Sequence, residues 1–162
     1  MQFVEVHDNI FNSTEIEEIL NEFKWKKSTG IVNILDEINH LNKLDLIKCL
    51  VLGKGHKTPV LAHALNTKCY DFTTKDHKIW EPHNDAEECK IITLLFVDID
   101  TNGWVGGELD IYKNLDVFDF PNNKTRIEPK VGRLVLFESS MIHAIRPYFG
   151  KKSRKTISIG WE

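Results

Sequence analysis

The chain has 162 residues, of which 41% are hydrophobic and 28% are charged, and its formal net charge is −3 at pH 7. This composition is typical of a globular protein and excludes a disordered one, and the length predicts a single domain over residues 1–162. The acidic balance gives no reason to expect a polyanionic partner. No apolar run approaches the roughly 20 residues that cross a bilayer, so no membrane partner is expected.

Cysteine usage and the N-terminus bear on the compartment. The cysteines are Cys49, Cys69 and Cys89, an odd number at wide spacing, and no Cys-x-x-Cys occurs. Neither a disulfide framework nor a zinc knuckle is therefore expected. The segment Met1-Gln2-Phe3-Val4-Glu5 lacks the pattern of a signal peptide. We expect the protein to work in a reducing cytoplasm.

A helix is predicted directly after a short strand at residues 3–11. Asn12 can serve as its N-cap and Glu15 falls at the third helical position, so the two residues can form a capping box. Apolar residues then recur at helical spacing from Ile16 to Phe23. We expect the apolar stripe that they form to pack on the face of a sheet.

Residues 30–52 are also predicted to be helical. One apolar set recurs at helical spacing over residues 31–38 and another over residues 41–51. The segment Gly53-Lys54-Gly55 ends the second helix. Residues 1–58 are therefore expected to form a mostly helical layer that supports the rest of the domain.

From Pro59 onward the sequence predicts short strands. They are expected at residues 60–67, 91–97, 108–112, 133–137 and 156–161. Clusters of turn residues separate them, and no helical pattern lies between them, so antiparallel pairing is expected. Many short antiparallel strands with helices on one side are typical of a sandwich or jelly roll. Residues 59–162 are expected to form that core.

The motif with the most chemical content is His83-Asn84-Asp85. In an extended segment, residues two apart point to the same side, so His83 and Asp85 can face one ion. His143, beyond a later strand, can complete a set of two histidines and one carboxylate, which holds Fe(II) on one face and leaves three positions open. Taken alone, the motif also fits a polar turn, and His143 fits an ordinary loop histidine.

The last predicted strand carries a second signal. Alternation places Arg154, Thr156 and Ser158 on one side and Ile157 and Trp161 on the other. A cation and hydroxyl groups on one face suit an anion, because a guanidinium can bind a carboxylate through two hydrogen bonds. The alternative is the solvent-exposed face of an edge strand.

In combination, these elements resemble the 2-oxoglutarate- and Fe(II)-dependent dioxygenases, in particular their prolyl-4-hydroxylase-like branch, from about Tyr70 to Trp161. The matching residues are His83-x-Asp85, Gly106-Gly107-Glu108-Leu109, Ile127-Glu128-Pro129-Lys130 with Gly132-Arg133-Leu134, His143 with Pro147, and Arg154-x-Thr156. The resemblance implies a mainly β fold with N-terminal helices. It is expected to be a double-stranded β-helix, a cupin-like jelly roll with helices packed on one sheet.

The resemblance also implies roles for the site residues. His83, Asp85 and His143 are expected to be the iron ligands. Arg154, assisted by Thr156, is expected to pair with the distal carboxylate of 2-oxoglutarate. The cofactors implied are Fe(II), with 2-oxoglutarate and O2 as cosubstrates, and ascorbate is a further candidate.

Three positions add to this set or compete with it. Lys152 lies on the same side of the strand as Arg154 and is an alternative partner for the distal carboxylate. Tyr70 resembles a tyrosine that lines the cosubstrate pocket. Phe96 or Val97 stands where close relatives carry a further tyrosine that contacts the cosubstrate.

The activity that the resemblance implies is hydroxylation of a prolyl residue in a peptide or protein, with succinate and CO2 as coproducts. Asp85 favours hydroxylation, because halogenating relatives lack this carboxylate. The open alternatives are an oxygenase acting on a small molecule or nucleobase, a cupin-like metal-binding domain that is not an oxygenase, and a non-catalytic interaction domain. The lack of a basic groove with interleaved aromatic residues argues against a nucleic-acid substrate.

Overall fold

The protein is seen here as a computed structural model that describes residues 2–26, 30–56, 58–67, 82–99, 105–113, 123–150 and 152–162. The described strands are β1 (Val4–His7), β2 (Gly30–Asn33), β3 (Pro59–Thr67), β4 (Ile91–Asp98), β5 (Val105–Gly106), β6 (Leu109–Tyr112), β7 (Lys124–Ile127), β8 (Leu134–Glu138), β9 (Ile142–Ile145), β10 (Tyr148–Phe149) and β11 (Arg154–Trp161). The helices are α1 (Ser13–Glu22), the 3-10 helix η1 (Leu35–His40) and α2 (Leu44–Leu52). Within these ranges no helix is long and apolar enough to span a membrane.

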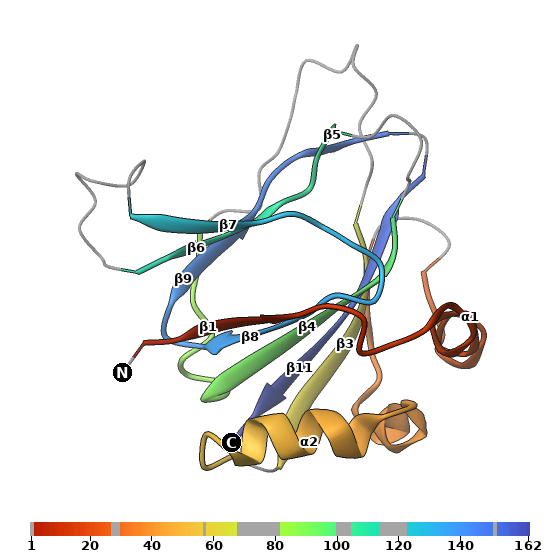
Figure 1. The fold of residues 1–162 in the computed structure, drawn as a ribbon, viewed down its shortest axis with the longest axis horizontal. Helices are drawn as coiled ribbons and strands as arrows, with labels where there is room; N and C mark the ends of the chain where they lie inside the picture. Colours follow the sequence, from red (N-terminus) through yellow and green to blue (C-terminus); the bar gives the residue numbers. More distant parts are fainter. Residues whose placement is uncertain are drawn as a thin grey trace.

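Two antiparallel sheets face each other, and α2 lies against the face of the larger sheet that is turned away from the smaller one (Figure 1). The larger sheet has the strand order β1-β8-β4-β11-β3-β2, and the smaller sheet has the order β7-β6-β9. β10 and β5 form a separate pair. All of these pairings are antiparallel, as predicted. The expected double-stranded β-helix with helices on one sheet is confirmed.

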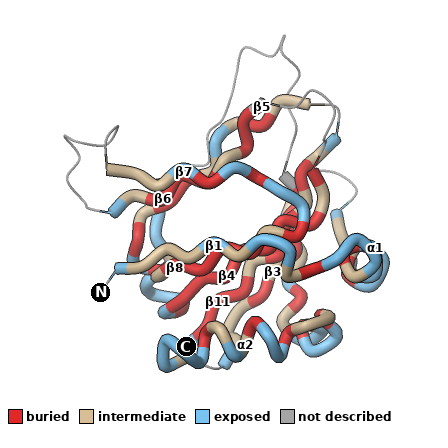
Figure 2. Tube along the Cα trace, viewed as in Figure 1, coloured by how far each residue is buried: buried red, intermediate tan, exposed pale blue. Residues whose placement is uncertain are grey.

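Alternation along the strands of the larger sheet divides its side chains between two apolar cores. The outer core, between the larger sheet and the helices, includes Ile19, Ile38, Ile47, Ala64, Leu95, Ile157, Ile159 and Trp161. The inner core, between the two sheets, includes Ile92, Leu94, Phe96, Leu109, Ile111, Val135 and Phe137. Figure 2 shows buried residues running along β4, β8 and β11. The larger sheet is therefore covered on both faces, which explains why β4 and β8 are apolar along almost their whole length.

The start of α1 agrees with the sequence prediction. The Asn12 side chain accepts a hydrogen bond from the Glu15 amide, and the Glu15 carboxylate accepts one from the Asn12 amide, so the capping box is complete. α2 ends at Leu52, directly before Gly53, also as predicted.

The prediction of helix from residue 30 is wrong for its first residues. Gly30–Asn33 form β2, which pairs with β3 along the edge of the larger sheet. Ile31 and Val32 are β-branched and favour an extended backbone, and the pairing with β3 decides between the two structures. The helical part begins only at η1, where the Asn33 side chain accepts a hydrogen bond from the amide of Leu35.

The last strand lies inside the larger sheet. β11 pairs with β3 on one side and β4 on the other, so the alternative of an exposed edge strand is wrong. It begins at Arg154, two residues before its predicted start at Thr156. Trp161 packs in the outer core, and its indole N–H donates to the Thr93 hydroxyl at 3.0 Å. One face of β11 therefore packs against the helices, and the other face is turned toward the space between the two sheets.

Candidate metal centre and adjoining cavity

His83, Asp85 and His143 come together between the two sheets. Each offers one ligand atom, and these atoms all lie within 4.8 Å of one another. The His83 Nε2 is 3.9 Å from Asp85 Oδ1, and the His143 Nε2 is 3.6 Å from Asp85 Oδ2. These separations are too long for direct hydrogen bonds, and they suit donor atoms grouped around one small cation. The predicted grouping of these three residues is therefore found.

Strand pairing brings the histidines together. The amide of His83 donates to the His143 carbonyl at 3.1 Å, and the amide of His143 donates to the His83 carbonyl at 2.9 Å. This antiparallel bridge adds the His83 segment to the smaller sheet beside β9. His143 itself lies within β9, opposite Ile111, and not in a loop after a strand. The four residues of β9 could not be recognised as a strand from the sequence, because the segments that pair with them, β6 and His83, are distant in the chain.

The protonation of His143 suits a metal ligand. Its Nδ1 lies 3.1 Å from the Met141 carbonyl, which can only accept, so Nδ1 carries the proton and Nε2 offers its lone pair toward Asp85. His143 is only 8% exposed. Burial lowers the pKa of the imidazole, although the hydrogen bond to Met141 opposes this shift. A neutral ring held in one tautomer is the form in which histidine binds metals.

A cavity of about 190 Å³ adjoins the three residues. Its apolar lining comes from both sheets and includes Leu94, Leu109 and Phe137. Thr156 and Ser158 of β11 add hydroxyl groups to the wall, as the alternation of that strand predicted. His63 of β3 also lines the cavity. His63 was not among the predicted site residues, although its position between Leu61 and Leu65 on one face of a predicted strand was a usable signal.

Arg154 lies buried on the same face of β11 as Thr156. It is 0% exposed, and its Nη1 donates to the Gly107 carbonyl. Its Nε and Nη2, and the Thr156 hydroxyl, have no hydrogen-bond partner among the residues described. Burial lowers the pKa of Arg154 to about 10, which leaves it charged at neutral pH. A buried cation with unused N–H donors beside a hydroxyl fits a carboxylate ligand, because leaving such donors unpaired is costly.

Burial and position distinguish between the other candidate residues. Lys152 is exposed, whereas Arg154 is buried. Phe96 lies in the inner core with its ring 5.4 Å from the Arg154 guanidinium carbon, and Val97 lies in the outer core. Of the two, Phe96 therefore stands beside the proposed anion site. Tyr70 lies outside the described residues.

The glycine pair before β6 shapes this region. Gly106 and Gly107 have φ values of 85° and 77°, in the left-handed region that favours glycine. A Cβ on Gly106 would collide with the Pro147 carbonyl, and one on Gly107 would lie 2.8 Å from the Tyr148 ring. The pair lets the backbone approach closely, and the Gly107 carbonyl thereby reaches Arg154.

Solved structures share this fold along almost the whole chain. A prolyl-4-hydroxylase from Pseudomonas putida aligns at 14% identity with a TM-score of 0.64, over 100% of this chain and 93% of that chain. A viral collagen prolyl hydroxylase from Paramecium Bursaria Chlorella virus-1 aligns at 17% identity with a TM-score of 0.64, over 98% of this chain and 94% of that chain. The alpha-ketoglutarate-dependent epimerase SnoN from nogalamycin biosynthesis aligns at 13% identity with a TM-score of 0.71, over 99% of this chain and 78% of that chain.

Sequence comparison adds the family. No curated protein sequence matches the chain. The family model described as the 2OG-Fe(II) oxygenase superfamily matches residues 67–161, which is more than half of the chain and includes all three grouped residues. The protein therefore belongs to the 2OG-Fe(II) oxygenase superfamily, enzymes that use Fe(II) as cofactor and 2-oxoglutarate as cosubstrate.

Proposed function

We propose that the protein is a hydroxylase in which His83, Asp85 and His143 hold Fe(II) and Arg154 and Thr156 hold the distal carboxylate of 2-oxoglutarate. The observation that carries this proposal is the fully buried Arg154, whose unpaired N–H donors lie on the same face of β11 as the cavity wall. Glu108 acts on the Arg154 guanidinium only at longer range, and no described carboxylate forms a close ion pair with it. A buried cation without such a pair is unfavourable unless a ligand supplies the negative charge.

We assign a separate role to each residue of the site. Fe(II), 2-oxoglutarate and O2 would together supply the oxidising chemistry that converts C–H to C–OH: one oxygen atom of O2 enters the hydroxyl group, the other enters succinate, and CO2 is released. Asp85 contributes the one negative charge of the ligand set, and His143 contributes a neutral nitrogen whose direction Met141 sets. Leu94 and Phe137 give the cavity beside these residues an apolar wall, which would limit the water around a bound cosubstrate.

The proposed substrate is a prolyl residue in a peptide or protein. The side chain of His83 is 41% exposed, so the metal side of the site opens to solvent and is accessible to a polymer. The names of two similar structures, both prolyl hydroxylases, support the same substrate class. An oxygenase acting on a small molecule is the second candidate, and the likeness to the epimerase SnoN supports it.

Conversion of 2-oxoglutarate to succinate tests the proposal. We expect turnover that requires Fe(II), and we expect His83→Ala and Asp85→Ala to abolish it while the far-UV circular dichroism stays unchanged. Each variant removes one of only three protein ligands. Retained turnover in either variant would contradict the proposed metal site.

The substrate class needs a separate measurement. Proline-containing peptides should stimulate succinate formation and gain one oxygen atom by mass spectrometry, and matched peptides with alanine in place of proline should do neither. Stimulation by small molecules alone would favour the second candidate.

A further inference from the structure

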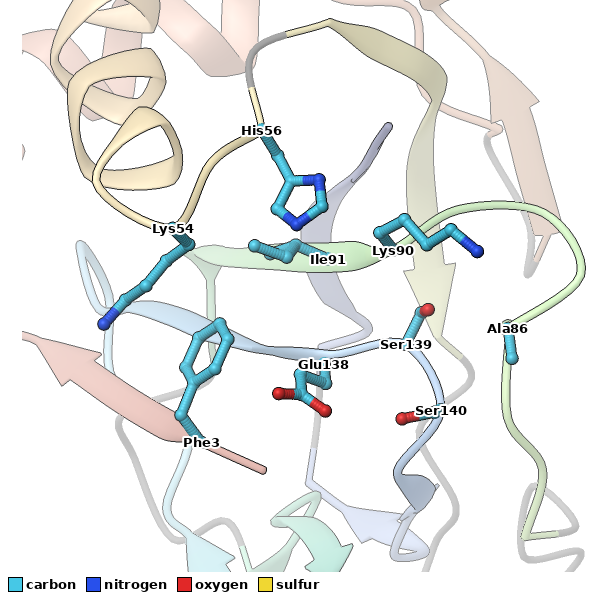
Figure 3. Close-up of a pocket in the computed structure, with 9 residues that line it drawn as sticks. All are labelled: Phe3, Lys54, His56, Ala86, Lys90, Ile91, Glu138, Ser139 and Ser140. Atoms are coloured by element: carbon cyan, nitrogen blue, oxygen red, sulfur yellow. The ribbon is translucent and has the colours of Figure 1, made fainter. Parts of the chain in front are cut away.

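Ser139 lies at the corner between β8 and β9 and has no role in the site described so far. It is 2% exposed. Together with its exposed neighbour Ser140, it lines a second cavity of about 500 Å³ near the end of β8 and the start of β4 (Figure 3). Ala86, the residue after the metal-site carboxylate Asp85, lines the same cavity. This cavity therefore lies on the other side of the turn that carries Asp85.

The residues after Asp85 form a single closed turn. The amides of Glu88 and Cys89 both donate to the Asp85 carbonyl, at 3.0 and 3.1 Å. The turn thus begins at Asp85 and closes at Cys89. Its ends must be held in place if the Asp85 carboxylate is to keep a constant position relative to the histidines.

Ser139 binds both ends of this turn. Its carbonyl accepts a hydrogen bond from the Asp85 amide at 2.9 Å, and its hydroxyl donates to the Cys89 carbonyl at 2.5 Å. Its amide also donates to the Lys90 carbonyl at 3.0 Å. Cys89 is buried, so water does not readily replace the hydroxyl as a donor. Of these three hydrogen bonds of Ser139, only the one to the Cys89 carbonyl is made by the side chain; the other two are made by backbone groups.

We propose that Ser139 is a positioning residue for the metal site. Its carbonyl holds the start of the turn at Asp85 and its hydroxyl holds the end of the turn at Cys89, and the two hydrogen bonds together fix Asp85 relative to His143. His143 follows Ser139 by four residues and pairs through its backbone with His83. One corner of the chain therefore connects all three ligands. The proposal rests on the proposed function, in which these residues bind Fe(II). Partners that orient metal ligands typically affect metal affinity by about 10- to 100-fold.

Metal binding to the folded protein tests this role without any substrate. Mn(II) serves as the probe, and its free concentration is followed by electron paramagnetic resonance. We expect Ser139→Ala to weaken Mn(II) binding at least about 10-fold, Ser139→Thr to restore it because the hydroxyl is kept, and Ser140→Ala to leave it unchanged. Urea unfolding of the metal-free variants measures stability separately.

The outcomes are distinguishable. A folded Ser139→Ala protein with wild-type Mn(II) affinity would overturn the positioning role, even if its free energy of unfolding were lower. If Ser139→Ala does not fold, Ser139→Cys, whose thiol is a weaker donor, should show intermediate affinity, and wild-type affinity there would overturn the proposal. If the wild-type protein binds no Mn(II), or binds it equally well as His83→Ala, the proposed metal site itself fails.

Discussion

The two faces of the larger sheet are built from the same strands, but they differ in how completely their polar groups are paired. On the outer face of β11, the Trp161 indole has a hydrogen-bond partner in Thr93, and Ile157 and Ile159 pack in the outer core. On the inner face, Arg154 and Thr156 are buried with donors that no described residue accepts. Buried polar groups in folded proteins are nearly always paired. The outer face therefore stabilises the fold, and the inner face carries the unpaired donors that we propose to bind a ligand.

The largest effect is expected from the inner face. In Arg154→Met, the KM for 2-oxoglutarate should rise by about 1000-fold, or about 4 kcal/mol, because truncating one partner of a buried, hydrogen-bonded charge pair has a cost of this order. The free energy of unfolding of the ligand-free protein should change by less than about 2 kcal/mol, since the lost cation forms no close ion pair with a described carboxylate and Glu108 acts on it only at longer range. Succinate formation at varied 2-oxoglutarate and urea unfolding measure the two quantities.

Lys152→Met is the matched control, since Lys152 is an exposed cation only two residues before Arg154 and lies outside β11. Its KM for 2-oxoglutarate should equal that of the wild type. A raised KM in Lys152→Met with an unchanged value in Arg154→Met would assign the carboxylate to Lys152.

The opposite result is expected from the outer face. Ile157, directly beside Thr156, is 0% exposed and packs against the helices. Ile157→Ala should lower the free energy of unfolding by about 3 kcal/mol through lost burial and a residual cavity. The KM for 2-oxoglutarate of the folded variant should stay near the wild-type value. Urea unfolding measures the loss, with Ser158→Ala as the stability control. A raised KM would show that the two faces are coupled.

The smallest effect is expected at an ion pair outside both faces. Asp8 accepts hydrogen bonds from the Arg133 guanidinium at 2.7 and 2.9 Å, and this interaction lowers the pKa of Asp8 to about 2. A lowered carboxylate pKa contributes stability above the unfolded-state value of about 4, and this contribution disappears as the pH falls through about 2.

Asp8→Asn tests this contribution. The variant should be less stable than the wild type by no more than about 1 kcal/mol at pH 6, because the pair is partly exposed. The difference should shrink steadily toward pH 2, as measured by urea unfolding at several pH values. A difference that is independent of pH would mean that the charge of Asp8 is not its source.

Much of this contrast between the two faces was readable in the sequence. Alternation along β11 correctly separated Arg154, Thr156 and Ser158 from Ile157 and Trp161, because a residue's face in a strand depends only on local geometry. The grouping of the triad was also predicted.

What was missed depends on pairing between distant segments. The apolar spacing of residues 31–38 suits a helix, and only pairing with β3 makes Gly30–Asn33 a strand. β9 is equally short and depends on β6 and on His83. The hydrogen bonds of Ser139 with Asp85 and Lys90 are made by backbone groups, and such bonds leave no pattern of residue types. These features follow from tertiary structure rather than from local sequence.

The positions of β1 and β2 have a consequence for the solubility of the protein. These two short strands form the outer edges of the larger sheet, where they cover β8 and β3. The family model begins at residue 67 and so includes neither of them. A chain cut back to the matched region would present unpaired backbone groups along the apolar strand β8 and would lack β3, leaving β11 open as well. Long, apolar open edges are sites of strand-to-strand aggregation. The N-terminal strands thus keep the oxygenase core from pairing with copies of itself.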